Sequence, residues 1–179
     1  QCDNQGFDAV NVYYHLTNYR SRIDDYLATL GASVNFRYDP LNIVINSLHI
    51  DLSDSDVDST NETNNALYLG EPCASDGSME RCILFLRPAT LTGLTALANC
   101  GAAPAVLYDL AREAVVVAHE YQHYVTDMVS GIGFGTTSEI LVGDIIHEGY
   151  SDYLGASYVS DLNDVEATLV GEYALQACS

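Results

Sequence analysis

Two histidines and a glutamate stand together in an otherwise apolar stretch of the chain, residues 115–125. His119 and His123 are four residues apart, so on an α-helix they lie on one face, one turn from each other. Two neutral imidazoles so placed can share a divalent metal ion, and zinc accepts such nitrogen ligands readily. Glu120 projects beside them, where its carboxylate can hold a metal-bound water without binding the metal itself. The pattern His-Glu-x-x-His therefore predicts a zinc site with a general base.

The same five-residue pattern also arises by chance on charged surface helices. Here the surrounding residues are apolar, and they carry the polar trio into an apolar interior: Val115, Val116, Val117, Ala118 and Val125. Burying two histidines and a glutamate without partners would strongly destabilise the fold, and a bound metal is one way to offset that cost. We therefore favour the metal site.

A third ligand is available in residues 145–155, where Glu148 and Asp152 are four apart and share a helical face. Glu148 follows His123 by 25 residues, which allows the first helix to end and a second helix to cross it. We expect Glu148 to complete the ligand set and Asp152 to accept the free ring N–H of a ligand histidine. The alternative is that both acids form the solvated face of an acidic helix.

Together, residues 117–127 and 148–152 resemble the thermolysin-like and fungalysin-like zinc metallopeptidases, whose third ligand is a glutamate in a Glu-x-x-Ser-Asp motif. The resemblance implies His119, His123 and Glu148 as zinc ligands. It also implies Glu120 as the general base and Asp152 as the residue that orients a ligand.

The chain also contains Asn64-Asn65-Ala66, followed by Leu67, and this is similar to the edge strand along the active-site cleft of those enzymes. An extended peptide can add to such an edge through main-chain hydrogen bonds. The resemblance implies Asn65 and Ala66 as substrate contacts. Leu67 stands where the family has an aromatic residue, and an ordinary edge strand is the alternative.

The spacing of apolar residues predicts an α+β chain in which a helix and a sheet precede two site-bearing helices, and the resemblance implies that this is a zincin domain. We expect a single compact domain over residues 1–179, with a helical and β-rich part over 1–103 and a zinc-binding helical part over 104–179. The expected helices cover 8–30, 105–128, 139–159 and 165–177, and the expected strands lie within 34–52, 64–70 and 83–86. Gly31 is the expected C-terminal cap of the first helix, and Tyr13, Tyr14 and Tyr26 are expected to widen its packed face.

The composition is strongly acidic, with 25 acidic residues against six arginines and a net charge of −19. Such a surface repels nucleic acid and anionic membranes, and no apolar run approaches the ~20 residues that span a bilayer. The first residues lack the features of a signal peptide, so we expect a mature, secreted chain.

The five cysteines favour an oxidising, extracellular compartment, and we expect a bridge between Cys73 and Cys82. The odd count leaves one thiol free, or paired with a partner chain or a missing C-terminal part.

A polar run over residues 51–62 contains Asp54, Asp56 and Asp58, which alternate as in a calcium loop. Ser59 occupies the position where an EF-hand needs glycine, so we expect a solvated loop. A calcium-binding module built on this run remains an alternative, with Ca²⁺ in place of Zn²⁺ as the dominant ion.

The proposed reaction is hydrolysis of peptide bonds in a peptide or protein substrate, with zinc-activated water and Glu120 as the base. Two departures from the family bear on activity. Phe134 aligns with the family's oxyanion-stabilising tyrosine, and the C-terminal lobe that carries the histidine donor is reduced or missing. His147 and His15 lie in no motif for that role, so either a nearby tyrosine such as Tyr121 or Tyr150 substitutes, or the chain is a minimal or clipped form, or activity is low. The alternative function is a catalytically weak or inactive, zinc-stabilised extracellular protein with a structural or binding role.

Overall fold

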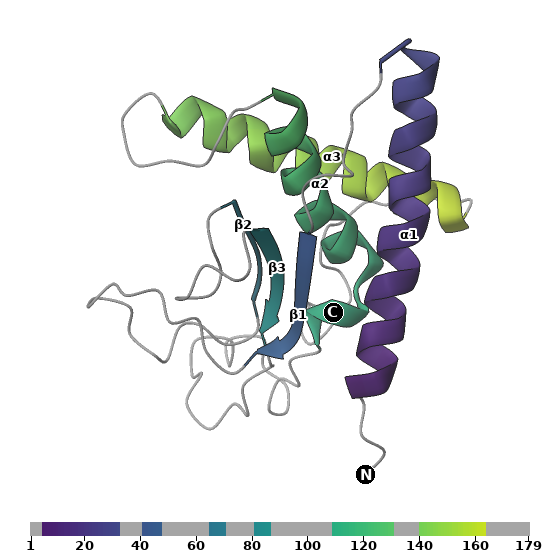
Figure 1. Ribbon diagram of the computed structural model, residues 1–179, viewed down its shortest axis with the longest axis vertical. Coiled ribbons are helices and arrows are strands. Elements are labelled where there is room, and N and C mark those ends of the chain that lie inside the picture. The colour runs from purple at the N-terminus through teal and green to yellow at the C-terminus, as the bar shows by residue number, and fades with distance from the viewer. Residues whose placement is uncertain are drawn as a thin grey trace, which may run out of the picture.

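The structure of the chain is a computed structural model that describes residues 5–32, 41–47, 65–70, 81–86, 109–130 and 140–163. In these residues it has an α+β architecture: an N-terminal helix, a three-stranded mixed sheet and two further helices (Figure 1). The order of elements agrees with the prediction. The expected final helix over 165–177 lies outside the described residues.

Helix α1 (Gln5–Thr29) begins three residues before the predicted start and ends one residue before the predicted end. Gly31 caps it with a left-handed φ of 69°, and its N–H donates to the Ala28 carbonyl at 3.0 Å, as expected for a C-terminal glycine. Val12, Tyr19 and Ile23 form the buried stripe of the helix.

The prediction that three tyrosines widen the packed face of α1 is wrong. Tyr13, Tyr14 and Tyr26 are 73%, 55% and 42% exposed. They lie beside the buried stripe, and no described element covers them. Counting these tyrosines as core residues therefore made the predicted buried face of α1 wider than the observed one.

The sheet consists of β1 (Leu41–Ser47), β2 (Ala66–Leu69) and β3 (Arg81–Leu86), in the order β1-β3-β2. β1 runs parallel to β3, and β2 runs antiparallel to it. Central strand β3 is buried on both faces, which suits its continuous apolar sequence. Among the described strands β2 is therefore an edge, as the sequence predicted.

The helix that carries His-Glu-x-x-His, α2 (Ala114–Ser130), starts later than predicted. Asp109 caps a short 3₁₀ helix, η3 (Leu110–Arg112), by accepting from the Ala111 N–H at 3.0 Å. Glu113 then adopts an extended conformation, with φ −91° and ψ 107°, and separates η3 from α2. A single helix from residue 105 is thus excluded over 109–113, because the extended backbone of Glu113 interrupts the helical conformation between η3 and α2.

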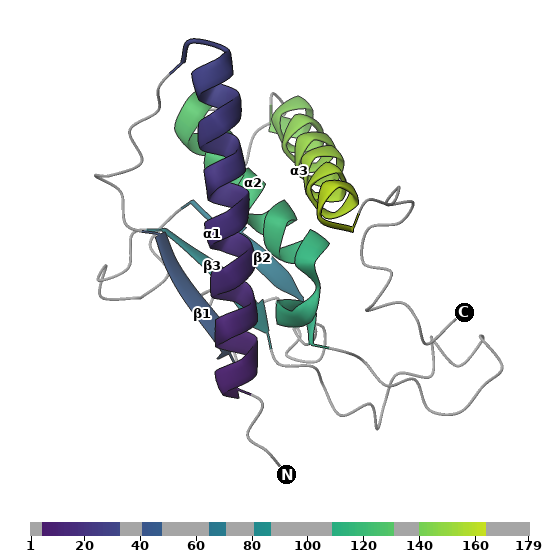
Figure 2. The same cartoon turned by 90° about the vertical axis from the view of Figure 1, so that its right-hand side faces the viewer.

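Helix α3 (Ile140–Asn163) extends about one turn beyond its predicted end. Figures 1 and 2 show α2 between the sheet and α3, with α1 running along the side of both α2 and the sheet. The main core joins the face of the sheet made by Ile83 and Phe85 to the buried faces of α1 and α2. α2 is consequently enclosed on several sides, and ten of its residues are buried.

Candidate metal centre

The centre forms where α3 crosses the first turns of α2. Gly155 of α3 is buried at this crossing, and a Cβ there would lie 3.1 Å from the Val115 carbonyl oxygen and 3.3 Å from the His119 backbone nitrogen. A larger residue would push the two helices apart. The glycine therefore permits the close approach that brings the preceding turns of α3 over the histidines of α2.

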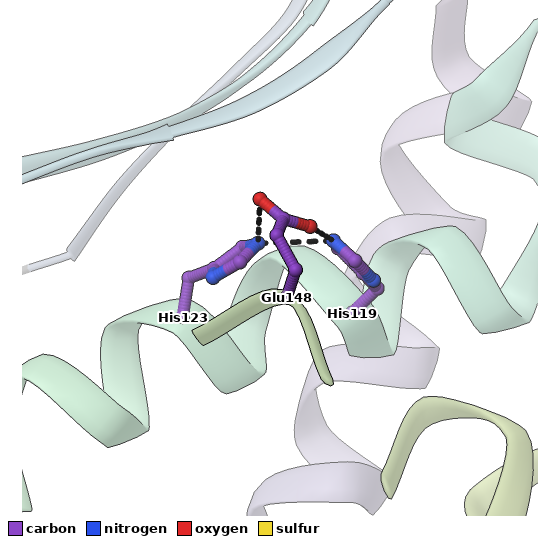
Figure 3. A group of neighbouring side chains, drawn as sticks. All are labelled: His119, His123 and Glu148. Atoms are coloured by element: carbon purple, nitrogen blue, oxygen red, sulfur yellow. Dashed lines mark hydrogen bonds and ion pairs between the residues drawn. The ribbon is translucent and has the colours of Figure 1, made fainter. Parts of the chain in front are cut away.

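His119, His123 and Glu148 form a group that could hold a metal ion. Each residue offers one ligand atom, and these three atoms lie within 4.8 Å of one another. The Nε2 atoms of the two histidines are 2.9 Å apart. Glu148 Oε2 lies 3.2 Å from His119 Nε2, and Oε1 lies 3.7 Å from His123 Nε2. Figure 3 shows the carboxylate placed over both imidazole edges. The structure thus brings together the three residues predicted as ligands, from two different helices.

These distances suit a small divalent metal ion such as zinc. Ligands at ~2.0–2.1 Å in a tetrahedral arrangement stand roughly 3.3 Å from one another, and the three observed separations lie on both sides of that value. The donor set of two imidazoles and one carboxylate is also one that catalytic zinc uses. The Glu148 side chain is 56% exposed, so solvent reaches the group from its side.

The burial of His123 favours metal binding. Desolvation, followed by the nearby His119 and His147 imidazoles, lowers the pKa of His123 to about 3. Its imidazole is therefore neutral at neutral pH, the form in which histidine binds metals. His123 does not need to lose a proton before it can act as a ligand.

Helix α3 also holds the second nitrogen of each histidine. Asp152 Oδ1 lies 2.9 Å from His119 Nδ1, in the position that the sequence predicted. Ser151 Oγ lies 3.1 Å from His123 Nδ1, and Ser151 is fully buried. Such partners orient the ring of a ligand histidine and select its tautomer. The contact of Ser151 was not anticipated, although its position three residues after Glu148 places it near the same helix face.

His147 occupies the space behind His123. It is fully buried, and its ring stacks on the His123 ring with centroids 5.7 Å apart and an interplanar angle of 25°. The sequence assigned no role to His147. In the structure it packs against a predicted ligand, a placement that its position immediately before Glu148 could have suggested.

Glu120 lies on the side of α2 that faces strand β2. Its side chain is buried, and it accepts a hydrogen bond from the backbone N–H of Tyr68. Burial, followed by the negative charge of Glu148, raises the pKa of Glu120 to about 8, while the Tyr68 N–H acts in the opposite direction. The predicted base is thus a carboxyl group close to the charge of the third predicted ligand.

The predicted substrate contacts lie at the start of β2. Asn65 is exposed, and its backbone carbonyl accepts from the Leu86 N–H at 2.8 Å. Bonded and non-bonded pairs alternate in an antiparallel ladder, so the backbone groups of Ala66 and Tyr68 point away from β3. The Ala66 N–H donates to the Asn65 side-chain oxygen at 2.9 Å. These residues therefore present main-chain groups at an edge that also contacts Glu120.

The tyrosines suggested as oxyanion donors do not point at the ligand group. Tyr121 is buried against α1, where its hydroxyl accepts from Arg20 Nη1 at 3.4 Å. Tyr150 is 55% exposed and lines an apolar cavity of about 710 Å³ between α1, α2 and α3. His15 of α1 lies 3.1 Å from the Tyr158 hydroxyl through its Nδ1.

Several sequence predictions fall outside the described residues. They concern the polar run with Asp54, Asp56 and Asp58, the position of Phe134, and the bridge from Cys82 to Cys73. Cys82 itself is buried in β3. Among the described helices, none has the length and apolar character that a membrane span requires.

Comparisons with protein-family models, with curated proteins and with solved structures found no match to this chain. The resemblance to zinc metallopeptidases therefore depends on the motifs of the sequence, and the metal centre depends on the geometry described above.

Proposed function

We propose that the protein is a zinc-dependent endopeptidase of the thermolysin-like type. The observation that carries this proposal is the convergence of His119, His123 and Glu148 beside the buried carboxyl group of Glu120. The open edge of β2 adjoins the same carboxyl group, which supports a polypeptide as the substrate.

The residues have the following roles in this proposal. His119, His123 and Glu148 hold the zinc ion, which when bound lowers the pKa of a water molecule and polarises a carbonyl group. Glu120 takes the proton from the attacking water and delivers it to the leaving amine. Asp152 and Ser151 keep the histidine rings in the orientation and tautomer that ligation needs.

The substrate is proposed to extend along β2. An extended peptide can donate a main-chain hydrogen bond to the outward carbonyl of Ala66, and Asn65, whose side-chain oxygen accepts from the Ala66 N–H, supplies its amide NH₂ at the same edge. The five cysteines favour secretion, with the chain folded as one zincin domain and one thiol available for a partner.

The test compares the wild-type protein with Glu120→Gln in a casein-cleavage assay. Wild type loaded with zinc should cleave, and a chelator should stop it. Glu120→Gln should bind zinc as wild type does, because Glu120 is not a ligand, and lose nearly all turnover. Undiminished cleavage by Glu120→Gln would refute the assignment of the base.

A second function, a zinc-stabilised protein without turnover, is favoured by one specific observation. The hydroxyl of Tyr121 is engaged by Arg20 on α1, and Tyr150 lines a cavity elsewhere, so neither of these tyrosines serves as an oxyanion donor. This alternative predicts a fall in melting temperature on chelation, with no cleavage by the zinc-loaded protein. Stabilisation by calcium in place of zinc would favour the calcium-binding alternative.

A further inference from the structure

Tyr68 of strand β2 is bound to helix α2 at two points. Its hydroxyl donates to Asp127 Oδ2 at 2.7 Å, and its backbone N–H donates to the Glu120 carboxylate. Glu120 and Asp127 are seven residues apart, which is close to two helical turns, so both lie on the face of α2 that meets the sheet. One residue of the edge strand thus spans two turns of the helix that carries the predicted base.

The backbone link is not part of the sheet. Since Asn65 and Leu86 form a hydrogen-bonded pair, alternation along the ladder directs the Tyr68 N–H away from β3. An edge-strand N–H in this orientation would ordinarily bond to water. Here it bonds to the carboxylate of Glu120, so the position of β2 directly affects the orientation of that group.

Asp127 connects the helix to a second strand as well. Its Oδ2 accepts from Arg81 Nε of β3 at 3.3 Å, and the two side chains are largely buried, with 18% and 25% exposed. Gly70, at the end of β2, passes close to the same carboxylate, because a Cβ there would lie 3.5 Å from Asp127 Oδ2. Asp127 therefore receives donors from two neighbouring strands at one end of α2.

We propose that Tyr68 and Asp127 form a clamp that fixes β2 against α2, so that the Tyr68 N–H orients the Glu120 carboxylate. Both are positioning residues, since neither is placed to touch zinc or the reacting atoms. The catalytic consequence rests on the proposed function, whereas the clamp itself can be tested in the metal-free protein.

The first test is amide hydrogen exchange of residue 68, measured by NMR without metal. In the wild-type protein this amide should be protected, and in Tyr68→Phe and Asp127→Ala it should exchange at least tenfold faster. Glu120→Ala should have the same effect, because it removes the acceptor. The Phe85 amide of β3, which points away from β2 towards β1, should keep its rate and so separate a local change from general unfolding. Tyr121→Phe, which removes a buried tyrosine hydroxyl of α2 that contacts Arg20 of α1, is the matched control.

The second test is kinetic and uses the zinc-loaded protein. Tyr68→Phe and Asp127→Ala should each lower kcat about tenfold and leave zinc affinity within twofold of wild type. The double variant should be no slower than either single variant, because each substitution breaks the same link. Asp127→Asn, whose oxygen can still accept from the Tyr68 hydroxyl, should recover most of the rate.

The two tests fail in different ways. An amide at residue 68 that exchanges equally fast in wild type, Tyr68→Phe and Asp127→Ala would overturn the clamp. Additive losses of kcat, or an equal loss in Tyr121→Phe, would overturn its catalytic role. If wild type cleaves nothing but shows the exchange pattern, the clamp stands and the peptidase proposal fails.

Discussion

The hydroxyl of Ser151 lies 3.1 Å from Nδ1 of His123, deep in the contact between α2 and α3. The next residue along α3, Asp152, lies 2.9 Å from Nδ1 of His119. Helix α3 thus provides the third predicted ligand, Glu148, together with a partner for each histidine. Metal affinity should therefore depend on the packing of α3 against α2 as well as on the ligands themselves.

Replacing Ser151 by alanine should weaken zinc binding about 10- to 100-fold, the usual effect of removing a partner of a ligand histidine. Competition with a chelating dye measures the affinity. Ser157→Ala is the control, because the Ser157 hydroxyl donates to the Tyr153 carbonyl of its own helix, away from the ligands. Equal zinc affinity in Ser151→Ala and wild type would show that the contact does not support the ligand.

Replacing the third predicted ligand, Glu148, should lower zinc affinity more than replacing Ser151. Glu148→Ala should lower zinc affinity by more than 100-fold, since it leaves two protein ligands where a catalytic zinc has three. Isothermal titration calorimetry should find one site in wild type. A wild-type affinity in Glu148→Ala would exclude the carboxylate from the ligand set.

The crossing of the helices can be tested at Gly155. A Cβ there would meet the backbone of α2 at 3.1 Å and 3.3 Å, so Gly155→Ala should destabilise the fold by about 1–3 kcal/mol and also weaken zinc binding. Gly149 is on the same helix, and a Cβ there would have no neighbouring atom within 4 Å. Gly149→Ala should therefore stabilise the protein by up to ~1 kcal/mol through helix propensity. Urea unfolding measures the stability of both variants. A stabilising Gly155→Ala would contradict the close crossing.

The pKa of Glu120 predicts a pH dependence of stability in the metal-free protein. The folded pKa, about 8, is above the ordinary value of 4.5, so the folded state keeps a proton that the unfolded state releases between these values. The neutral carboxyl group of Glu120 contributes fully to the free energy of unfolding below pH 4.5. This contribution is lost as the pH rises towards 8, by at most about 1.4 kcal/mol per pH unit. The stability of wild type relative to Glu120→Gln should fall over this range in urea unfolding with chelator present. A difference that stays constant with pH would contradict the buried, protonated carboxyl.

Local spacing was sufficient for part of the fold and of the centre. Four-residue separations place His119 over His123, and Glu148 near Asp152, on any α-helix, because the helical repeat is a property of the backbone alone. Apolar periodicity likewise located α1, and a short apolar run located β3. The edge position of β2 was expected from the resemblance of residues 64–66 to the metallopeptidase edge strand. The start of α2 was misplaced, because Asp109 begins a separate 3₁₀ turn and the extended backbone of Glu113 ends it before α2 starts.

By itself, then, the amino-acid sequence determined which residues have the chemistry to bind zinc and which helix faces carry them. Only the tertiary structure decided that Ser151 meets His123, that His147 stacks behind it, and that Tyr68 connects Glu120 with Asp127. These contacts join segments that are far apart in the chain. They depend on how closely α3 and β2 approach α2, which is set by packing at positions such as Gly155 and is not encoded in any local spacing.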